Sequence, residues 1–487
     1  MNIGSAPVTL GQLTKGIVTH GFDDLPVFGM TLDSRKVRDG DLFLAISGQA
    51  VDGRDFINQA YERGAVAVLA ETPVKTENDS RTVVAIDELS KYAGLIANRF
   101  YNYPSKHIRV VGVTGTNGKT TCCHILAQAL NELGSCASVI GTIGNGVLGA
   151  LRDNSLTTPD VLSVHQELSK NLSEEADVVC MEVSSHALDQ NRVDGVLFDV
   201  AVFTNLSQDH LDYHHDMTSY GKAKSKLFQI KSLSSCVINI DDVFGCQLSQ
   251  LIEPELLWTY GVSEQARVRQ LLAKVERNHI RIDCRVNGAV VEIKAPLAGA
   301  FNVSNVLAVF TTLMAMGYSS NKAVESLLAT RPVPGRMELI DVLGKPLVVI
   351  DFAHTPDALD NVLKNCRGLT QGKVWVVFGC GGDRDKGKRP QMGAVASQLA
   401  DHAIITNDNP RYEKPELIAA DICAGMNGRQ QVCLDRKQAI AQALKNAGKD
   451  DLILIAGKGH ETDQDFGSYK QSFSDRAVVA ELFELRQ

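Results

Sequence analysis

Short apolar runs alternate with helix-length amphipathic stretches along almost the whole chain of 487 residues. In the first hundred residues the apolar runs are GDLFLAI at 40–46 and GAVAVLAE at 64–71, and each follows a turn or a helical stretch. Such alternation is typical of α/β proteins, in which parallel strands are joined by helices. The first part of the chain therefore predicts a small α/β unit.

The middle of the chain continues this pattern and adds an antiparallel stretch at 268–297. Asn287 and Gly288 divide that stretch, and an Asn-Gly pair between apolar runs is a strong signal for a two-residue hairpin turn. The remaining strands expected here begin with IRVVGVTG and lie at 108–115, 177–183, 200–206 and 234–241.

The last third predicts a second doubly wound sheet, with strands in KPLVVIDFAH, GKVWVVFGC, DHAIIT and DLILIAGKG. Each of these strands ends in polar residues. In such sheets ligands bind outside the carboxyl ends of the strands. The simplest interpretation of DNPR at 408–411 is a turn, because Asn-Pro after a strand is typical of one. Four polar strand ends in one sheet favour a ligand site as well.

The length predicts about three domains, at roughly 100–200 residues for each. Pro-containing segments lie at 102–108 (NYPSKHI) and 331–336 (RPVPGR). We therefore expect an N-terminal domain at 1–105, a central domain at 106–332 and a C-terminal domain at 333–487.

Composition excludes several classes of protein. The chain has 49 Lys and Arg against 57 Asp and Glu, a formal charge of −8, which argues against a general nucleic-acid or membrane-surface binder. We expect no signal peptide and no membrane span. The eleven cysteines are scattered without metal-site spacing, as expected of buried thiols in a reducing compartment. The sequence predicts a cytoplasmic protein.

The segment VVGVTGTNGKTTCCHILAQAL is the most informative one, because a β-branched strand runs through a Gly-rich turn into an amphipathic helix. Backbone N–H groups at such a turn, together with the helix N-terminus, bind phosphate oxygens. Lys119 supplies a positive charge for the terminal phosphates, and the Thr120 hydroxyl suits Mg²⁺. The strict phosphate-loop pattern requires glycine where this chain has Val113, so the loop is a variant. The sequence predicts nucleotide binding without naming a reaction.

Two further segments of the central domain contain possible metal ligands. Glu182 ends a predicted strand, where a carboxylate suits Mg²⁺, although a solvated glutamate is the alternative. The segment 209–216 contains three Asp and three His residues. A zinc site is conceivable there, but the residues lack a tetrahedral ligand pattern, and hard ligands beside a phosphate loop favour Mg²⁺. Physical reasoning alone does not single out His210 or Lys224.

Ten ordered motifs extend these observations: GVTGTNGKTT, EVSSHALDQNRV, FTNLSQDHLDYH, YGKAKSKLF, GAFNVSNVLA, VPGRME, DFAHTPDAL, GGDRDKGKRP, DNPR and AGKGHE. In this order they resemble the Mur ligase family over essentially the whole chain. Within the family they look like the branch that adds meso-diaminopimelate to the UDP-N-acetylmuramoyl dipeptide in peptidoglycan synthesis.

The resemblance implies three domains, for the UDP-sugar, for ATP and for the incoming amino acid. It also implies Mg²⁺ as cofactor and an acyl-phosphate intermediate, for which positioning and electrostatics are the main tasks of the protein. A monomer is expected, with no nucleic-acid or membrane partner.

The family's functional residues transfer to this chain by motif position. The positions matching the catalytic residues are Lys119, Lys224 and His210. Those matching the ATP contacts are Gly115, Thr116, Asn117, Gly118, Lys119, Thr120, Thr121, Asn302, Arg336 and Asp351. Those matching the Mg²⁺ ligands are Thr120, Glu182, His210 and Lys224, of which Lys224 matches a carbamylated lysine.

The substrate positions transfer in the same way. Those matching the UDP-sugar-peptide contacts are Leu32, Ser34, Gln49, Ala50, Val51, Thr157, Thr158, Ser184, Gln190 and Arg192. Those matching the diaminopimelate contacts are Arg389, Asp408, Asn409, Pro410, Arg411, Gly457 and Glu461. The stretch ISGQAV departs from the family pattern, which weakens the transfer at 49–51.

Arg411 is the residue expected to select the amino acid, because a guanidinium matches the distal carboxylate that diaminopimelate has and lysine lacks. Glu461 would accept from the distal ammonium, and Asn409 would add hydrogen bonds. Three alternatives stay open. They are a lysine-adding ligase of the same family, a folylpolyglutamate synthase, and a transport or motor ATPase that shares only the phosphate loop.

Overall fold

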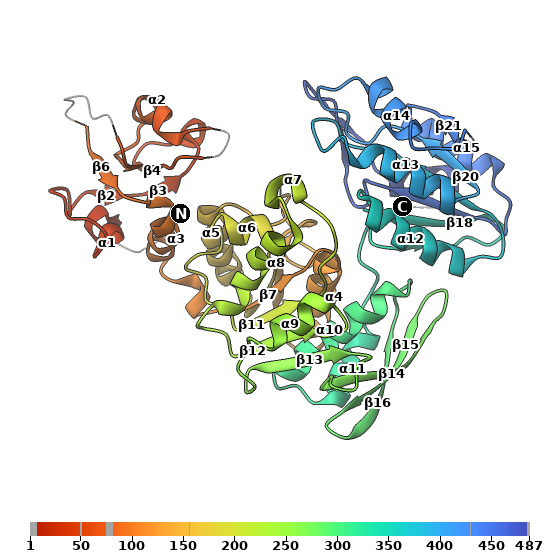
Figure 1. Cartoon of the computed structure of the whole chain (residues 1–487). Helices are drawn as coiled ribbons and strands as arrows, with labels where there is room; N and C mark the ends of the chain where they lie inside the picture. Colours follow the sequence, from red (N-terminus) through yellow and green to blue (C-terminus); the bar gives the residue numbers. More distant parts are fainter. Residues whose placement is uncertain (1–6, 49–50, 75–80, 155, 429, 485–487) are drawn as a thin grey trace. The chain divides into compact units, whose positions relative to one another are not determined.

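The computed structural model describes residues 7–48, 51–74, 81–154, 156–428 and 430–484 (Figure 1). The chain divides into two compact units. The first comprises Met1–Thr114, Gly134–Ala201 and Lys222–Ser234, and the second comprises Gly115–Leu133, Val202–Gly221 and Ser235–Gln487. Neither unit is continuous in sequence, and each is described by itself.

The first unit begins with a small parallel sheet of order β3-β4-β5-β6. Its strands are Gly29–Thr31, Asp41–Ala45, Ala67–Glu71 and Val83–Ile86. Leu42 and Leu44 face a core shared with helices α1 (Leu10–Thr14) and α3 (Leu89–Phe100), whereas Phe43 packs on the opposite face against α2 (Ile57–Glu62). The predicted strands at 40–46 and 64–71 are confirmed.

The first unit also contains neighbouring strands in the order β7-β10-β8-β9. They are Arg109–Thr114, Val178–Glu182, Ala137–Gly141 and Gly144–Val147, and β9 alone runs antiparallel. Helices α5 (Val161–Ser173) and α6 (Ser185–Asp189) belong to this part. Because β10 ends at Glu182 and α6 follows almost at once, the polar residues 182–192 lie at a strand end, as predicted.

The second unit contains strands β12 to β16 in sequential order. They are Ser235–Asn239, Leu257–Gly261, Val268–Val275, Ile280–Val286 and Ala289–Ala295. The first three run parallel and the last three form an antiparallel meander. Asn287 and Gly288 have φ of +50° and +82°, which confirms the predicted hairpin turn. Helices α4 (Lys119–Glu132) and α10 (Phe301–Ala315) pack against each other.

The C-terminal part of the second unit is a six-stranded sheet of order β17-β18-β22-β19-β20-β21. Only β17 is antiparallel. The strands in that order are Glu338–Ile340, Leu347–Asp351, Leu452–Ala456, Val374–Phe378, His402–Ile405 and Gln430–Val432. The four strands predicted in the last third of the chain are therefore confirmed, and so is the α/β fold class with a doubly wound sheet.

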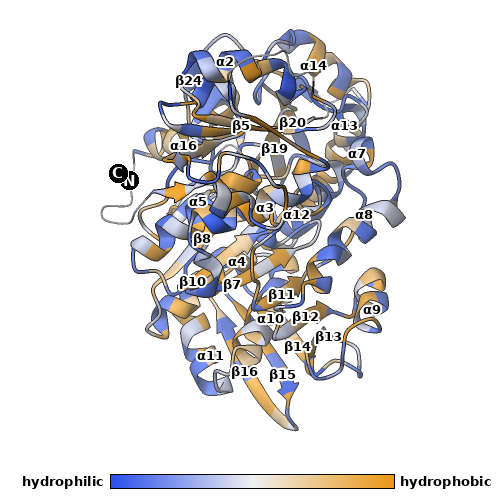
Figure 2. Ribbon diagram, turned by 90° about the vertical axis from the view of Figure 1, so that its left-hand side faces the viewer, coloured by the Kyte–Doolittle hydropathy of each residue, from blue (hydrophilic) through white to orange (hydrophobic). Residues whose placement is uncertain are grey.

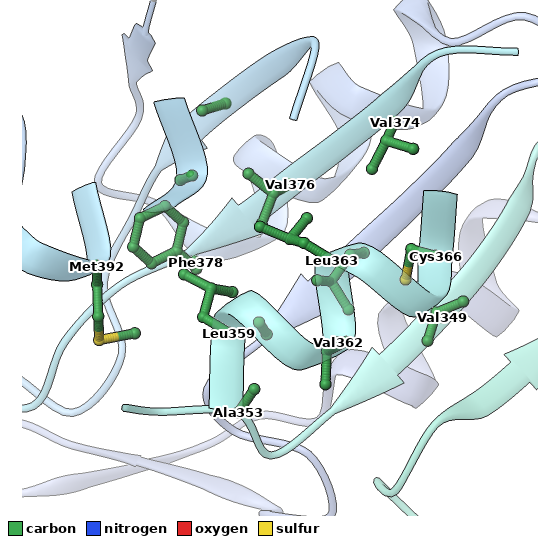
Figure 3. Close-up of a cluster of buried hydrophobic side chains, with 14 of the residues drawn as sticks. Val349, Ala353, Leu359, Val362, Leu363, Cys366, Val374, Val376, Phe378 and Met392 are labelled. Atoms are coloured by element: carbon green, nitrogen blue, oxygen red, sulfur yellow. The ribbon is translucent and has the colours of Figure 1, made fainter. Parts of the chain in front are cut away.

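Alternate residues of these strands enter two different cores. Val349, Val376 and Phe378 pack with α12 (Pro356–Leu369), α13 (Lys388–Leu399) and α14 (Pro415–Cys423), as Figure 3 shows for part of this cluster. Their neighbours in sequence, such as Val348 and Val377, pack with α15 (Arg436–Asn446) and α16 (Asp475–Leu482). This period of two, with both faces apolar, is what a parallel sheet covered on both sides requires.

Helices carry hydrophobic and hydrophilic residues on the same ribbon in Figure 2, as expected when one face is buried. No helix in the described ranges is long and apolar enough to cross a membrane. The remaining elements are β1 (Val8–Thr9), β2 (Pro26–Val27), η1 (Ser34–Lys36), η2 (Gly53–Phe56), η3 (Pro104–Lys106), β11 (Val200–Phe203), α7 (Leu211–His214), α8 (Met217–Ser225), η4 (Lys226–Gln229), α9 (Val243–Ser249), α11 (Ser320–Leu328), β23 (Asp463–Asp465) and β24 (Lys470–Ser472).

Candidate nucleotide, metal and substrate sites

The predicted phosphate loop joins β7 to the first residue of α4. Gly118 caps the helix at φ +87°, and a Cβ there would lie 2.4 Å from Asn305 Oδ1. A Cβ on Gly115 would lie 1.9 Å from Thr204 Oγ1. Glycine is therefore required at both positions by steric contact as well as by backbone conformation at Gly118. The turn leaves the N-terminal N–H groups of α4 at the loop, where an anion is favoured.

A polar segment that follows β11 holds this loop in shape. Asn205 accepts from the N–H of Thr116 through its carbonyl at 2.8 Å and from the N–H of Asn117 through its side chain at 2.9 Å. Thr204 Oγ1 donates to the Asn117 carbonyl at 2.6 Å. The Ser207 N–H donates to Thr116 Oγ1 at 3.0 Å. These contacts rigidify the backbone, so its N–H groups can be aimed without reorganisation.

Lys119 and Arg336 converge on the same loop from different parts of the chain. Lys119 Nζ donates to the carbonyls of Gly115 and Thr116, both at 2.8 Å. Arg336 Nη2 donates to Thr120 Oγ1 at 3.0 Å, and its guanidinium lies 4.6 Å from the centroid of the Phe352 ring. The Pro-containing segment 331–336 thus brings a cation to the phosphate loop.

Two other predicted nucleotide contacts are buried in the structure. Asp351 accepts from the N–H groups of Met337 and Ala353 at 2.7 and 2.8 Å, and burial raises the pKa of its carboxyl. Asn302 donates to the Ala298 carbonyl at 2.7 Å and accepts from Asn305. Asp351 thereby holds the backbone next to Arg336, and Asn302 holds the side chain of Asn305, which lies against Gly118 of the loop.

Five predicted UDP-sugar-peptide residues and Glu182 form one network in the first unit. Thr158 Oγ1 donates to the Glu182 carbonyl at 2.8 Å and also accepts from the Ser184 N–H at 3.0 Å. Arg192 donates to the Thr158 carbonyl at 3.1 Å and to Gln190 at 2.9 Å. Thr157 is connected to this network by Thr142, whose hydroxyl lies 3.1 Å from both Thr157 Oγ1 and Glu182 Oε2.

The Glu182 carboxylate is oriented by its neighbours. The Thr142 N–H donates to Oε1 at 2.8 Å. A Cβ on Gly141 would lie 2.2 Å from the same oxygen. A carboxylate fixed in this way, with hydroxyl groups beside it, provides the hard oxygen donors that Mg²⁺ prefers.

The four predicted metal ligands are divided between the two units. Glu182 and Lys224 belong to the first unit, and Thr120 and His210 belong to the second. The Lys224 side chain is buried, and His210 Nε2 lies 3.4 Å from Asp209 Oδ2. Over the described part of the chain, no three His, Cys, Asp or Glu residues gather as a possible metal site. Within the described residues, the segment 209–216 therefore brings together no cluster of the donors that zinc prefers.

The remaining UDP-sugar candidates lie near the small N-terminal sheet. Ser34 Oγ donates to Gln59 at 2.6 Å at the start of η1, and Leu32 is half-buried two residues earlier. Val51 is exposed. Gln49 and Ala50 lie outside the described residues.

The predicted amino-acid site contains a polar cluster at the carboxyl ends of β20 and β22. Lys458, which is fully buried, donates to Asn409 Oδ1 at 3.0 Å and to Glu461 Oε2 at 2.6 Å. Asn409 Nδ2 donates to the same Glu461 oxygen at 2.9 Å. The three side chains are mutually bonded, so the two predicted contacts Asn409 and Glu461 are held by a lysine that was not predicted as a contact.

Arg411, two residues after Asn409, has an unusual backbone conformation. Its φ is +50°, and its N–H donates to the Asp465 carbonyl at 2.9 Å. The guanidinium donates to the Gly382 carbonyl at 2.7 Å and lies 3.7 Å from the Asp465 carboxylate. Residues other than glycine rarely adopt this left-handed conformation, and those that do cluster at functional sites. DNPR therefore forms a turn that also positions a cation.

Asp408 and Gly457 fit together closely. A Cβ on Gly457 would lie 2.5 Å from Asp408 Oδ2, so only glycine lets β22 end beside this carboxylate. The Asp408 carbonyl accepts from Gln464 Nε2 at 3.0 Å. The Pro410 carbonyl accepts from the Glu413 N–H at 3.1 Å.

Arg389 is fully buried and held by acidic residues. It donates to Glu413 at 2.9 and 3.1 Å, to Asp421 at 2.9 Å and to the Gly381 carbonyl at 3.2 Å. The hydrogen bonds from Arg389 lower the pKa of the Glu413 carboxyl to about 2. Arg389 thus fixes the loop after β19, beside which the Arg411 guanidinium lies.

Several residues of these sites were missed from the sequence. Thr204 and Asn205 fall inside the strand predicted at 200–206, whereas β11 ends at Phe203, so the predicted strand was too long to reveal them as polar residues at a strand end. Lys458 stands at the end of the predicted strand DLILIAGKG but is not among the residues that the family motifs assign to the site. Thr142 and Gln464 carry no local signal, because their roles depend on which segments meet in the fold.

Models of one family match most of the chain in three segments. They are described as "Mur ligase family, catalytic domain" for residues 26–101, "Mur ligase middle domain" for 113–313 and "Mur ligase, glutamate ligase domain" for 335–459. The chain belongs to the Mur ligase family. Members of this family are ATP-dependent amide ligases, and so is this chain. The transport ATPase alternative is thereby excluded.

Relatives of this Mur ligase match it over nearly the full length. A protein of Xanthomonas campestris is 45% identical, with 98% of this chain and 97% of that protein covered. A protein of Chromobacterium violaceum is 45% identical, with 94% of each covered. Both are named UDP-N-acetylmuramoyl-L-alanyl-D-glutamate–2,6-diaminopimelate ligase.

Solved structures agree with the fold. A structure with the same ligase name has a TM-score of 0.71 and 32% identity, and covers 98% of this Mur ligase and 99% of its own chain. The ligase MurF of Thermotoga maritima, solved in complex with ADP, has a TM-score of 0.63 and 19% identity, with 94% and 96% covered. At that identity the second match supports the fold alone.

Proposed function

We propose that this Mur ligase adds meso-diaminopimelate to the D-glutamate of UDP-N-acetylmuramoyl-L-alanyl-D-glutamate. The observation that carries the proposal is the bonded cluster of Asn409, Lys458 and Glu461, with the guanidinium of Arg411 from the same DNPR turn, at the carboxyl end of the C-terminal sheet. This cluster offers a guanidinium and a carboxylate that match the two charged groups at the distal end of diaminopimelate. The names of the full-length relatives support the same substrate.

The proposed reaction has two steps. The D-glutamate carboxylate attacks the γ-phosphorus of ATP, which forms an acyl phosphate and breaks the bond to ADP. The amine of diaminopimelate then attacks the acyl carbon, phosphate leaves with its bonding electrons, and the amine loses a proton to form the amide. Such phosphoryl transfer depends on positioning and charge stabilisation more than on covalent chemistry of the protein.

Residues of this chain supply these functions in the proposal. The N–H groups at Gly115–Thr121 and the Lys119 ammonium would bind the phosphates, and Arg336 would approach them beside Thr120. Thr120, Glu182, His210 and carbamylated Lys224 would hold Mg²⁺, which offsets phosphate charge when bound. The carbamate gives the buried Lys224 side chain a carboxylate-like end, which makes a lysine suitable at a metal site.

The substrate assignments complete the proposal. Thr157, Thr158, Ser184, Gln190 and Arg192 would contact the UDP-sugar-peptide, because they form one network around Glu182. The N-terminal contacts would be Leu32, Ser34 and Val51. We propose a cytoplasmic monomer in peptidoglycan precursor synthesis, and we retain the three domains at 1–105, 106–332 and 333–487.

The proposal is tested by measuring ADP release with ATP, Mg²⁺ and the UDP-dipeptide, with diaminopimelate or L-lysine added. Release that requires diaminopimelate supports the proposal, and a product mass increased by one diaminopimelate residue verifies the amide. Faster release with lysine would assign the lysine-adding reaction instead. No release with either amino acid would reject both.

A further inference from the structure

An ion pair outside all the predicted site residues lies directly behind the amino-acid site. Arg436 begins α15 and Asp475 begins α16, and both side chains are 0% exposed. The guanidinium binds the carboxylate with two parallel bonds, from Nε to Oδ1 and from Nη2 to Oδ2, each 2.7 Å long. Two buried charges in a bidentate pair fix each other's orientation.

The same guanidinium reaches the ends of two strands. Arg436 Nη1 donates to the Asn407 carbonyl at 3.2 Å, and Nη2 donates to the Ala456 carbonyl at 3.0 Å. Asn407 immediately precedes Asp408 and Asn409, and Ala456 immediately precedes Gly457 and Lys458. Each carbonyl therefore belongs to the last residue before a segment of the amino-acid site.

The segments that begin at Asp408 and Gly457 follow β20 and β22, and these two strands are not hydrogen-bonded to each other. In the sheet, β19 lies between β22 and β20, so the strands that end at Ala456 and Ile405 are not neighbours. Asn409 and Glu461, which bind each other, arise from the two different strands. Their separation therefore depends on the β19 ladders, on the bonds of Asn409 to Lys458 and Glu461, and on the two carbonyl bonds of Arg436.

The Arg436–Asp475 pair is itself held in place by the helices that carry it, α15 and α16. Asp435 caps α15 by accepting from Gln438, and Ser474 caps α16 by accepting from Ala477. Both helices pack on the sheet through one apolar cluster that includes Ala439, Ile440 and Val479. The guanidinium is thus held by two capped helices while its donors point at the sheet's carboxyl edge.

We infer that the Arg436–Asp475 pair is a positioning device of the amino-acid site, which sets the distance between the Asn409 segment and the Lys458–Glu461 segment. This inference rests on the proposed function for the identity of the ligand. It makes Arg436 a positioning residue, because its guanidinium acts on the two segments through the main-chain carbonyls of Asn407 and Ala456.

The test replaces the pair as a whole by Arg436→Met with Asp475→Leu. Replacing a buried ion pair by apolar residues of similar volume is often neutral for stability, whereas removing one partner is not. The double variant therefore removes the two carbonyl bonds without leaving a buried charge. The matched control is Lys437→Met with Glu481→Leu, which removes an exposed pair of 2.8 Å between the same two helices.

The readouts are the KM for each substrate, kcat and the melting temperature. We expect the KM for diaminopimelate to rise at least about tenfold, since sites loosened by about 1 Å lose this much or more. The KM for ATP and for the UDP-dipeptide should not change, and the control should resemble wild type in every readout. A folded double variant with an unchanged KM for diaminopimelate would overturn the inference.

If the double variant does not fold, Arg436→Lys provides the second arm. An ammonium keeps the charge opposite Asp475 but cannot span the carboxylate and both carbonyls, so the same selective rise in KM is expected, and its absence also overturns the inference. Wild-type enzyme assayed in parallel separates the two proposals. Without diaminopimelate-dependent turnover in wild type, it is the proposed function that fails.

Discussion

The ammonium of Lys458 lies 2.6 Å from the carboxylate of Glu461, and the lysine side chain is completely buried. Lys458→Met should therefore leave Glu461 without its closest cation and Asn409 without one of its donors. We expect a loss of about 1–3 kcal/mol in stability and a KM for diaminopimelate raised tenfold or more, at about 1.4 kcal/mol for each factor of ten. Steady-state kinetics and thermal unfolding measure the two effects.

Lys470→Met is the matched control for that change, because Lys470 pairs with Asp463 at 3.1 Å on the exposed surface nearby. Exposed pairs contribute about 0–1 kcal/mol. Equal effects of the two substitutions would contradict a special role for Lys458.

Arg411→Ala should reduce the use of diaminopimelate far more than it improves the use of lysine. The Arg411 guanidinium is proposed to bind the distal carboxylate of diaminopimelate, which the variant would leave unpaired. An unpaired charged group costs about 2–4 kcal/mol, or roughly 30- to 1000-fold in kcat/KM. The measurement is kcat/KM for both amino acids. Arg277→Ala, which removes a half-exposed arginine paired with Asp341, should change neither value, and the proposed selection is wrong if Arg411→Ala behaves likewise.

Gly141→Ala should weaken the binding of Mg²⁺ at Glu182 and so raise the Mg²⁺ concentration that the reaction requires. The added Cβ would lie 2.2 Å from Glu182 Oε1, so the carboxylate must leave the position set by Thr142. Loss of an orienting contact of a metal ligand typically costs about 10- to 100-fold in affinity. Mg²⁺ titration of ADP release measures the shift, with Gly21→Ala, which meets no atom within 4 Å, as control. An unaltered Mg²⁺ requirement would argue against Glu182 as a ligand.

His165 should make the protein less stable as the pH falls from 6.5 to 4. Burial lowers the pKa of this imidazole to about 4, whereas in the unfolded chain it is about 6.5. Between these values the unfolded state binds the proton and the native state does not, so stability is full above pH 6.5 and declines below it. The expected loss at pH 5 relative to neutral pH is about 2 kcal/mol.

His165→Gln tests this, because a glutamine amide can still donate to the Asp194 carbonyl that lies 2.9 Å from Nε2. Urea unfolding at pH 7.5 and pH 5 should show a smaller difference for this variant than for wild type. His107→Gln, at an exposed histidine of the same unit, should leave the difference unchanged. A wild-type protein equally stable at both values would refute the prediction.

Much of the fold could be predicted from the sequence because it depends on local pattern. β-branched runs such as 374–378 and 452–456 formed strands where predicted, and the Asn287-Gly288 turn fixed a hairpin. The phosphate loop could also be predicted, since strand, glycines, lysine and helix are consecutive. By contrast, the division into two compact units follows contacts between distant segments and has no local signal.

The candidate sites divide in the same way. Asp408, Asn409, Arg411 and Glu461 stand at strand ends, so the sequence with its family motifs determined the residue types and the edge of the sheet at which they lie. Only the tertiary structure decided that Lys458 bonds both Asn409 and Glu461, and that Arg436 binds the carbonyls that precede both segments. Local periodicity is encoded by neighbouring residues, whereas the bonds to Asn409 and to the two carbonyls join residues 20 to 49 positions apart, which meet only once strand order and helix packing are set.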